Sequence, residues 1–72
     1  MSEQQKFLKA IGRNIDNKRK EQGLSFQKLA LRCDIEKSNL VKLTSQGTNI
    51  TLTSLYKISK GLNVPVHELL KL

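Results

Sequence analysis

Residues 24–43 read LSFQKLALRCDIEKSNLVKL, and their pattern of apolar and polar residues indicates the fold class. Its apolar residues recur at the spacing that buries one side of each of two short helices, which we predict over about 26–32 and 36–45. Ser25 is a suitable N-cap for the first of them, and Cys33 fits as a small buried hydrophobe near its end. The positions that we expect in the core are Leu24, Leu29, Ala30, Ile35, Leu40 and Leu43.

The second of these helices keeps polar residues on its outer side. A short exposed helix that carries cations and hydrogen-bonding side chains has the right shape for the major groove of DNA. Lysine can donate to guanine O6 and N7, serine can donate or accept, and asparagine can read adenine. The outward residues are Lys37, Ser38, Asn39 and Lys42.

The composition favours a small domain with a polyanionic partner. The 72 residues predict one domain, 1–72, and the 13 Lys and Arg against 6 Asp and Glu give a formal net charge of +7. Such an excess indicates DNA, RNA or an anionic membrane as the partner. RNA is the weaker candidate, because Phe7, Phe26 and Tyr56 imply no stacking platform.

Other kinds of site are disfavoured by the residues available. Cys33 is the only cysteine and His67 the only histidine, so we expect no disulfide, no metal and no other cofactor. His67 and Glu68 are most simply a surface pair. The sequence has no catalytic constellation and no phosphate-cradling glycine loop, so we expect neither an enzyme nor a small-molecule ligand. Its apolar runs are too short for a membrane span or a signal peptide, which predicts a cytoplasmic protein without a membrane partner.

Three further helices are predicted around this pair. One covers about 6–22, after a polar lead-in at 1–5 that we expect to be frayed, and Gly23 ends it. Another covers about 52–61, capped by Thr51 and closed by Gly61 and Asn63, and the last covers about 65–71, with Pro65 at its first position. The inward residues expected on the first two are Leu8, Ile11, Ile15, Arg19, Gln22, Leu52, Leu55 and Ile58.

The last helix carries more apolar surface than one terminal turn can usually bury. The surplus either completes the core or pairs with a second copy of the chain, and we favour the second interpretation. A homodimer is therefore expected. The residues assigned to its interface are Val64, Val66, Leu69, Leu70 and Leu72.

These segments together resemble the Xre/Cro-like helix-turn-helix regulators, the lambda-repressor type of DNA-binding domain. The likeness covers roughly residues 11–70, with the helix-turn-helix at about 25–45. It lies in the order and spacing of several short motifs. These are Ile11-Gly12 with Ile15 and Arg19, Gly23-Leu24-Ser25 with Leu29-Ala30, then Ile35, Leu40 and Leu43, then Leu52, Leu55, Ile58, Leu62 and Val64, and finally Glu68-Leu69-Leu70.

The resemblance implies an all-α, compact five-helix domain that binds double-stranded DNA, often as a symmetric dimer on a palindromic operator. Helix 36–45 would enter the major groove, and the base-contacting residues would be Lys37, Ser38 and Lys42, with Asn39 flanking. Basic and polar residues elsewhere are candidates for contacts to the DNA backbone. They are Arg13, Lys18, Gln27, Lys28, Thr48 and Asn49.

The chain departs from the family pattern at four positions. Phe26 stands where the family usually has a phosphate-binding Gln, and Glu36 where it has a Ser or Thr cap. Thr44 replaces a Glu that often pairs with the Arg of the first helix, so Arg19 is expected to find another acceptor or to pack its stem on the core. The expected turn glycine is Gln46, with Gly47 one residue later, which predicts an altered loop.

Other functions stay open at this point. An exposed Phe26 beside Val41 would form an apolar patch suited to a protein partner, which favours an interaction module that has lost specific DNA binding. Residues 49–52, with Ser54-Leu55 and 60–62, resemble the restriction–modification controllers, a narrower group of regulators. An antitoxin or a phage repressor fragment is also open.

Overall fold

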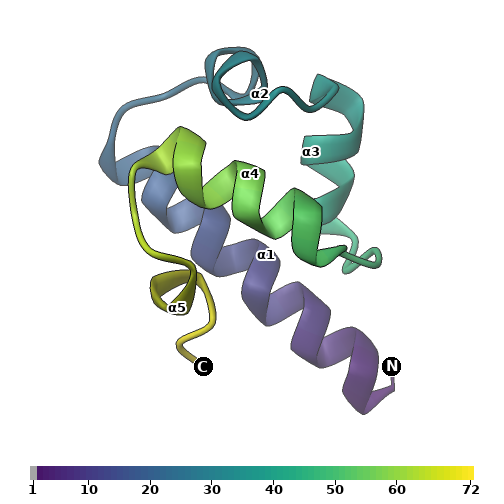
Figure 1. Ribbon diagram of the computed structural model, residues 1–72. Helices are drawn as coiled ribbons and strands as arrows, with labels where there is room; N and C mark the ends of the chain where they lie inside the picture. Colours follow the sequence, from purple (N-terminus) through teal and green to yellow (C-terminus); the bar gives the residue numbers. More distant parts are fainter. Residues whose placement is uncertain (1) are drawn as a thin grey trace.

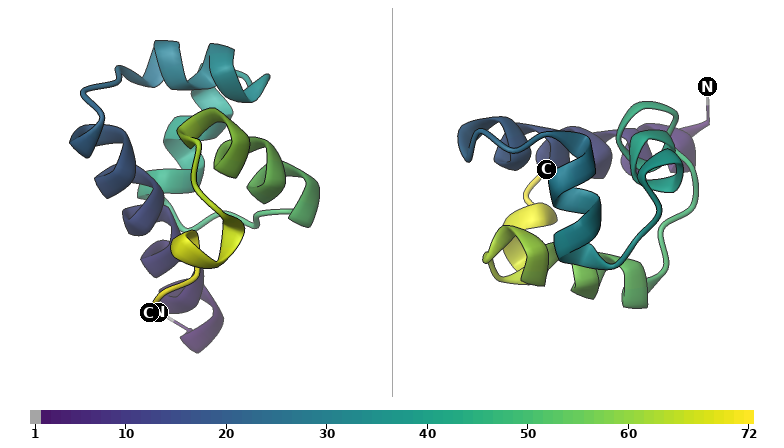
Figure 2. Two further views of the ribbon diagram at one scale, coloured as in Figure 1. Left: turned by 60° about the vertical axis from the view of Figure 1, so that its left-hand side comes forward. Right: turned by 90° about the horizontal axis from the view of Figure 1, so that it is seen from above.

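The computed structural model describes residues 2–72, which form a bundle of five α-helices (Figure 1). The all-α, five-helix architecture predicted from the sequence is confirmed. α2 packs mainly on α4, and α3 packs mainly on α1. α5 lies against α1 and α4, away from α2 (Figures 1 and 2). The helix bounds are α1 Glu3–Glu21, α2 Phe26–Cys33, α3 Lys37–Ser45, α4 Leu52–Leu62 and α5 Val66–Leu69.

Three helices begin at a hydroxyl cap. The side chains of Ser2, Ser25 and Thr51 accept hydrogen bonds from the backbone N–H three residues later, at 3.1, 3.0 and 3.0 Å. The caps predicted at Ser25 and Thr51 are confirmed. α1 begins at Glu3, directly after the Ser2 cap, so the predicted start at about residue 6 is three residues late and residues 3–5 belong to the helix; Met1 lies outside the described residues.

Left-handed residues end the helices where the chain must turn. Gly23, at φ +66°, follows α1 as predicted, and Asp34 and Asn63 take the same conformation after α2 and α4. Gly61 does not close α4, since it lies within that helix. The last helix is also shorter than expected: Pro65 is its N-cap and not its first residue, and Leu70 already ends it.

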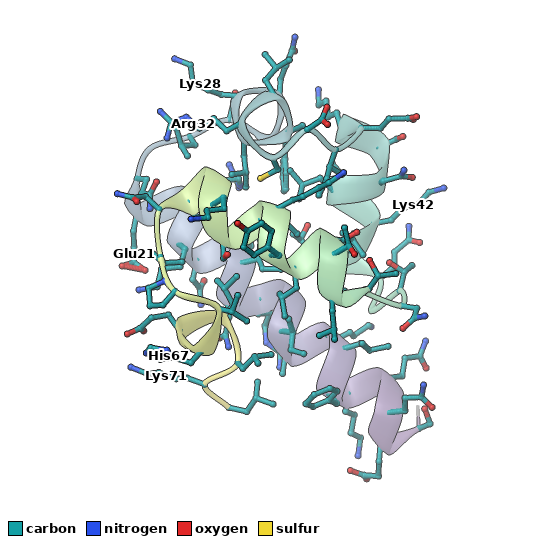
Figure 3. All side chains as sticks on the ribbon, in the orientation of Figure 1. Glu21, Lys28, Arg32, Lys42, His67 and Lys71 are labelled. Carbon is teal, nitrogen blue, oxygen red and sulfur yellow. The ribbon has the colours of Figure 1, made fainter. Side chains whose placement is uncertain are left out.

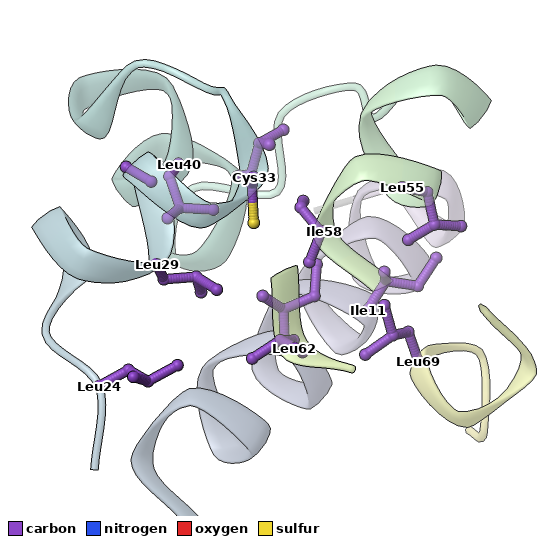
Figure 4. Packing of buried hydrophobic residues seen from close by; sticks show 12 residues of the cluster. Ile11, Leu24, Leu29, Cys33, Leu40, Leu55, Ile58, Leu62 and Leu69 are labelled. Atoms are coloured by element: carbon purple, nitrogen blue, oxygen red, sulfur yellow. The ribbon is translucent and has the colours of Figure 1, made fainter. Parts of the chain in front are cut away.

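The core lies where all five helices meet, and Figure 4 shows its packing. The residues with less than 2% exposure are Ile15, Leu29, Leu40, Ile58, Leu62 and Leu69. Five of the six core positions predicted from residues 24–43 are buried, and the sixth, Ile35, is half-buried against the hydrophobic core.

Leu52 is a wrong core prediction, since 84% of it is exposed. Leu52 is the first residue of α4, directly after the Thr51 cap, and at this end of the helix its side chain faces solvent. Ile50, which precedes the cap, is half-buried against the core instead. In a hydrophobic staple, the residue before the N-cap packs against the fourth residue of the helix. In α4 these two residues are Ile50 and the buried Leu55.

Candidate nucleic-acid interface

The turn between α2 and α3 is built from local backbone chemistry. Asp34 takes the left-handed conformation at φ 56°, and the Ile35 N–H donates to the Ala30 carbonyl at 3.1 Å. Ile35 then packs on the core, which fixes where α3 leaves the turn. Glu36 is the N-cap of α3, and within residues 2–72 its side chain makes no capping hydrogen bond. The position of α3 therefore depends on packing more than on its cap.

Two glycines bring the helix-turn-helix close to the rest of the domain. A Cβ atom on Gly12 of α1 would lie 2.5 Å from the Leu43 carbonyl oxygen and 3.0 Å from Thr44 Cα, both in the backbone of α3. A Cβ atom on Gly61 of α4 would lie 2.5 Å from Cys33 Sγ at the end of α2. Because neither glycine has a side chain, α1 can approach α3 and α4 can approach α2 at backbone distance. The orientation of α3 depends on these contacts.

The outer side of α3 is exposed as the sequence predicts. Leu40 and Leu43 point into the core, and the other side of the helix faces solvent. The exposed residues on that side include the four predicted to contact bases, Lys37, Ser38, Asn39 and Lys42. They present two cations, a hydroxyl and an amide on about one and a half turns of helix, and these groups can donate to base edges and to phosphates.

An open hollow of about 270 Å³ lies between α3 and the start of α4. It brings together two residues predicted to contact bases, Asn39 and Lys42, and two predicted to contact the backbone, Thr48 and Asn49. Its other lining residues are Ile35, Leu43 and Ser54. The sequence reasoning missed Ser54, whose hydroxyl accepts from Thr51 Oγ1 at 3.0 Å. The feature of the sequence that could have pointed to Ser54 is its position three residues after the Thr51 cap, whose hydroxyl accepts from the Ser54 N–H.

The loop after α3 is seated on α1. Gly47 is buried at φ +64°, and a Cβ atom there would lie 2.7 Å from Lys9 Cγ and 3.1 Å from the Gln5 carbonyl oxygen. Gln46 keeps a right-handed helical conformation, so the turn glycine is displaced by one residue, as predicted. This contact holds Thr48 and Asn49 beside α3.

The other predicted backbone contacts are dispersed. Arg13, Gln27 and Lys28 are exposed, and Lys18 is half-buried with its Nζ 4.0 Å from Glu21 Oε2. Figure 3 shows Lys28 pointing away from Lys42, on the opposite side of the α2–α3 pair. The structure therefore assembles α3 and the 48–49 loop into one surface but does not bring Lys28 next to Lys42.

Arg19 has found another acceptor, which confirms the expectation from the missing Glu. Its Nε donates to Asp16 Oδ1 at 2.9 Å, and its Nη1 donates to the Leu24 carbonyl at 2.7 Å. Its Cζ lies 4.0 Å from the ring centroid of Phe26. The guanidinium thus links α1, the turn after it and the first residue of α2.

The same cluster lowers the pKa of the Asp16 carboxyl. Burial raises this pKa, but the hydrogen bonds from Arg19 and Lys20, together with the charges of these two cations, outweigh burial and leave the pKa below its usual 3.8. Asp16 therefore stays ionised at neutral pH and keeps Arg19 in place.

The apolar patch expected from Phe26 and Val41 is not present as predicted. Phe26 is half-buried, covered by the Arg19 guanidinium and packed against the core, and Val41 is half-buried as well. Thr44, which replaces the family's Glu, donates its hydroxyl to the Val41 carbonyl at 3.0 Å. Phe26 and Val41 therefore do not form the exposed patch that would have favoured a protein-interaction module.

The predicted dimer residues divide into three groups by burial. Leu69 is fully buried in its own domain and cannot offer surface to a partner, so its assignment is wrong. Val64 and Val66 are half-buried against the core. Leu70 and Leu72 are 41% and 67% exposed, and on α4 Leu52 and Tyr56 are 84% and 56% exposed.

Cys33 is buried, as the sequence suggested.

Two further observations concern other kinds of site. Among residues 2–72, no helix has the length and apolar character needed to cross a membrane. In the same part of the chain, the His, Cys, Asp and Glu side chains form no group of three or more that could hold a metal ion.

Comparison with known proteins gives one family and several similar structures. The sequence model of the family HTH_3, "Helix-turn-helix", matches residues 15–69. Among solved structures, the restriction–modification controller protein C.AhdI from Aeromonas hydrophila superposes with a TM-score of 0.83 at 24% identity, over 86% of this chain and 94% of that one. The restriction–modification controller protein C.Esp1396I gives 0.78 at 27% identity, over 82% and 77%.

A third similar structure covers nearly the whole chain. The hypothetical transcription factor NHTF from Neisseria superposes with a TM-score of 0.85 at 22% identity, over 99% of this chain and 82% of that one. At 22 and 24% identity, NHTF and C.AhdI establish the fold alone. A comparison with curated protein sequences finds no match.

Proposed function

Because this chain belongs to the helix-turn-helix family HTH_3, of the Xre/Cro type, we propose that it places α3 in the major groove of a specific operator. The chain is a DNA-binding transcription regulator. On this proposal it controls transcription by occluding a promoter or by contacting polymerase from an adjacent site. Its partner is double-stranded DNA, and its formal charge of +7 supplies the sequence-independent part of the affinity.

The observation that carries this proposal is the single surface formed by α3 and the loop after it. Asn39 and Lys42 project from α3 into the same hollow that Thr48 and Asn49 line from the loop. A helix seated in the major groove places its side chains on base edges, while the flanking loop meets the sugar–phosphate backbone. We assign base reading to Lys37, Ser38, Asn39 and Lys42, and backbone contact to the loop.

Lys42→Ala is expected to weaken binding to the operator by about 1–3 kcal/mol if Lys42 reads a guanine. Binding to random duplex should change much less, so the ratio of specific to non-specific affinity falls. Fluorescence anisotropy at two salt concentrations measures both affinities. Equal losses on the two duplexes would reassign Lys42 to a phosphate.

Lys60→Ala is the matched control for this measurement. Lys60 is exposed on α4, next to the Tyr56 ring and outside the hollow, and its replacement removes the same charge. We expect it to weaken operator and random DNA alike and only slightly. If wild-type protein failed to bind even random duplex at low salt, the DNA-binding proposal would be wrong, and a protein partner would be favoured.

We also propose that the chain binds its operator as a homodimer. The exposed Leu70 and Leu72, together with Leu52 and Tyr56, supply apolar surface beyond the helix-turn-helix. A two-fold dimer would set two copies of α3 about 34 Å apart, one turn of DNA. Sedimentation equilibrium of the wild type should show a monomer–dimer equilibrium at micromolar concentration. A monomer at every concentration, with and without operator, would overturn this part of the proposal.

Control of restriction–modification genes is the narrower candidate. It is supported by the controller-like residues 49–52 and 60–62 and by the similarity to the controller protein C.Esp1396I at 27% identity. Selection of bound sites from a random DNA library, followed by location of these sites in the source genome, tests it. Palindromic sites upstream of restriction–modification genes would support it. Sites elsewhere would leave a regulator of another kind.

A further inference from the structure

Asn14, in the middle of α1, links this helix to the end of α5 and the residues after it. Its Nδ2 donates to the Leu69 carbonyl at 3.0 Å and to the Lys71 carbonyl at 2.6 Å. These acceptors lie 55 and 57 residues further along the sequence. One amide therefore uses both of its N–H groups to hold the last carbonyl of α5 and one carbonyl of the residues that follow it.

The carbonyls at the end of α5 need hydrogen-bond partners from another element, although the Leu70 N–H donates to the His67 carbonyl and Lys71 pairs with Glu68. α5 has four residues, and the last carbonyls of any helix lack partners within that helix. The side chain of Leu69 is anchored in the core, with 0% exposure. Beyond it the backbone is irregular, and Asn14 supplies the hydrogen bonds that this segment cannot make for itself.

The two carbonyls that Asn14 holds alternate with the two exposed leucines. Leu70 follows the first carbonyl and Leu72 follows the second, and they are 41% and 67% exposed. Turning both carbonyls toward α1 fixes the backbone from which these side chains project. An apolar pair that is already ordered loses less conformational freedom when it becomes buried by a partner.

The charges of this segment suit a second copy of the chain as the partner. Two copies that each carry a formal charge of +7 repel each other unless they meet where cations are already neutralised. Lys71, between the two leucines, pairs with Glu68 of its own chain at 3.1 Å. The hydrogen bond and the charge of Lys71, with a smaller contribution from Lys18, leave the pKa of Glu68 below its usual 4.5, so Glu68 is ionised at neutral pH.

We propose that Asn14 is a positioning residue for self-association, which holds segment 69–72 so that Leu70 and Leu72 can be buried against a second copy. This inference rests on the homodimer proposed above. It predicts that removing the amide weakens the dimer without unfolding the domain, because Asn14 is not part of the hydrophobic core.

Asn14→Ala is expected to raise the dimer dissociation constant by about tenfold, as measured by sedimentation equilibrium on the full chain. Asn17→Ala is the matched control: it makes the same substitution on an exposed position of the same helix and should change the constant less than about twofold. Asn14→Asp keeps the size but loses the donor, and should weaken the dimer at least as much. Circular dichroism checks that each variant is folded.

A double-mutant cycle separates positioning from general stability. If Asn14 acts through the two leucines, then Asn14→Ala has no further effect in a chain that already carries Leu70→Ala and Leu72→Ala. Full additivity, or a dimer unchanged by both Asn14 variants while the wild type dimerises, would overturn the role of Asn14 and leave the homodimer standing. A wild type that never dimerises would overturn both.

Discussion

Gly12→Val is expected to lower the free energy of unfolding by about 3 kcal/mol, the upper part of the range for overpacking. The new Cβ would lie 2.5 Å from the Leu43 carbonyl oxygen and 3.0 Å from Thr44 Cα. Both atoms belong to the backbone of α3, so no side-chain rotation can relieve the clash. Either α3 moves away from α1 or the domain loses the contact altogether. Denaturant titration measures the loss.

This variant should also impair DNA binding in the molecules that remain folded. α3 carries the residues assigned to base reading, and a shift of the whole helix changes where all of them point. We therefore expect the ratio of operator to random-DNA affinity to fall. Asn17→Val puts the same β-branched residue on an exposed site of α1 and should change the free energy of unfolding by no more than about 0.5 kcal/mol. A Gly12→Val protein as stable as this control would contradict the close α1–α3 contact.

Arg19→Ala is expected to destabilise the domain by about 3 kcal/mol, because three interactions end at one guanidinium. Asp16 and Arg19 are 24% and 14% exposed, so solvent screens their ion pair only partly. The Leu24 carbonyl would lose its 2.7 Å donor, and the Phe26 ring would lose the cation above it. Thermal or denaturant unfolding at pH 7 measures the effect.

Lys20→Ala is the control, since it removes the other cation beside Asp16. Lys20 is 65% exposed and lies 3.3 Å from Asp16 Oδ2, so its loss should cost no more than about 0.5 kcal/mol. The pH dependence gives a second check. The pKa of Asp16 is lower in the folded state than its unfolded value of 3.8. The ionised carboxylate therefore contributes fully to the free energy of unfolding above pH 3.8, and this contribution is lost as the pH falls through the folded pKa.

The difference between wild type and Arg19→Ala should accordingly shrink in strong acid. At pH 7 it includes the ion pair, whereas at a pH below the folded pKa of Asp16 it retains only the bond to Leu24 and the contact with Phe26. A difference that stayed constant with pH would show that Asp16 contributes nothing to the anchoring of Arg19.

Much of the candidate site could be predicted because it lies on one helix. Leu40 and Leu43 turn one side of α3 to the core, so Lys37, Ser38, Asn39 and Lys42 had to face outward. The hollow between α3 and the 48–49 loop could not be predicted in the same way. Its shape depends on Gly47 resting on Lys9 and Gln5 of α1, a contact between segments that are far apart in the sequence.

Features that depend on contacts within a few residues could be predicted from the sequence alone. The spacing of apolar residues predicted α2, α3 and the turn between them. The hydroxyls of Ser25 and Thr51 predicted the starts of α2 and α4, and Gly23 predicted the end of α1. These depend on local hydrogen bonds and backbone conformation, which neighbouring residues settle.

The burial of several side chains follows from the packing of the helices and could not be predicted from neighbouring residues. Phe26 is covered by the Arg19 guanidinium and is not exposed as expected. Leu52 is exposed because it is the first residue of α4 after the Thr51 cap, and Leu69 is buried in the core of its own domain. Asn14 found its acceptors more than fifty residues away. The physical reason is that burial and long-range hydrogen bonds depend on which surfaces meet, and local sequence does not specify that choice.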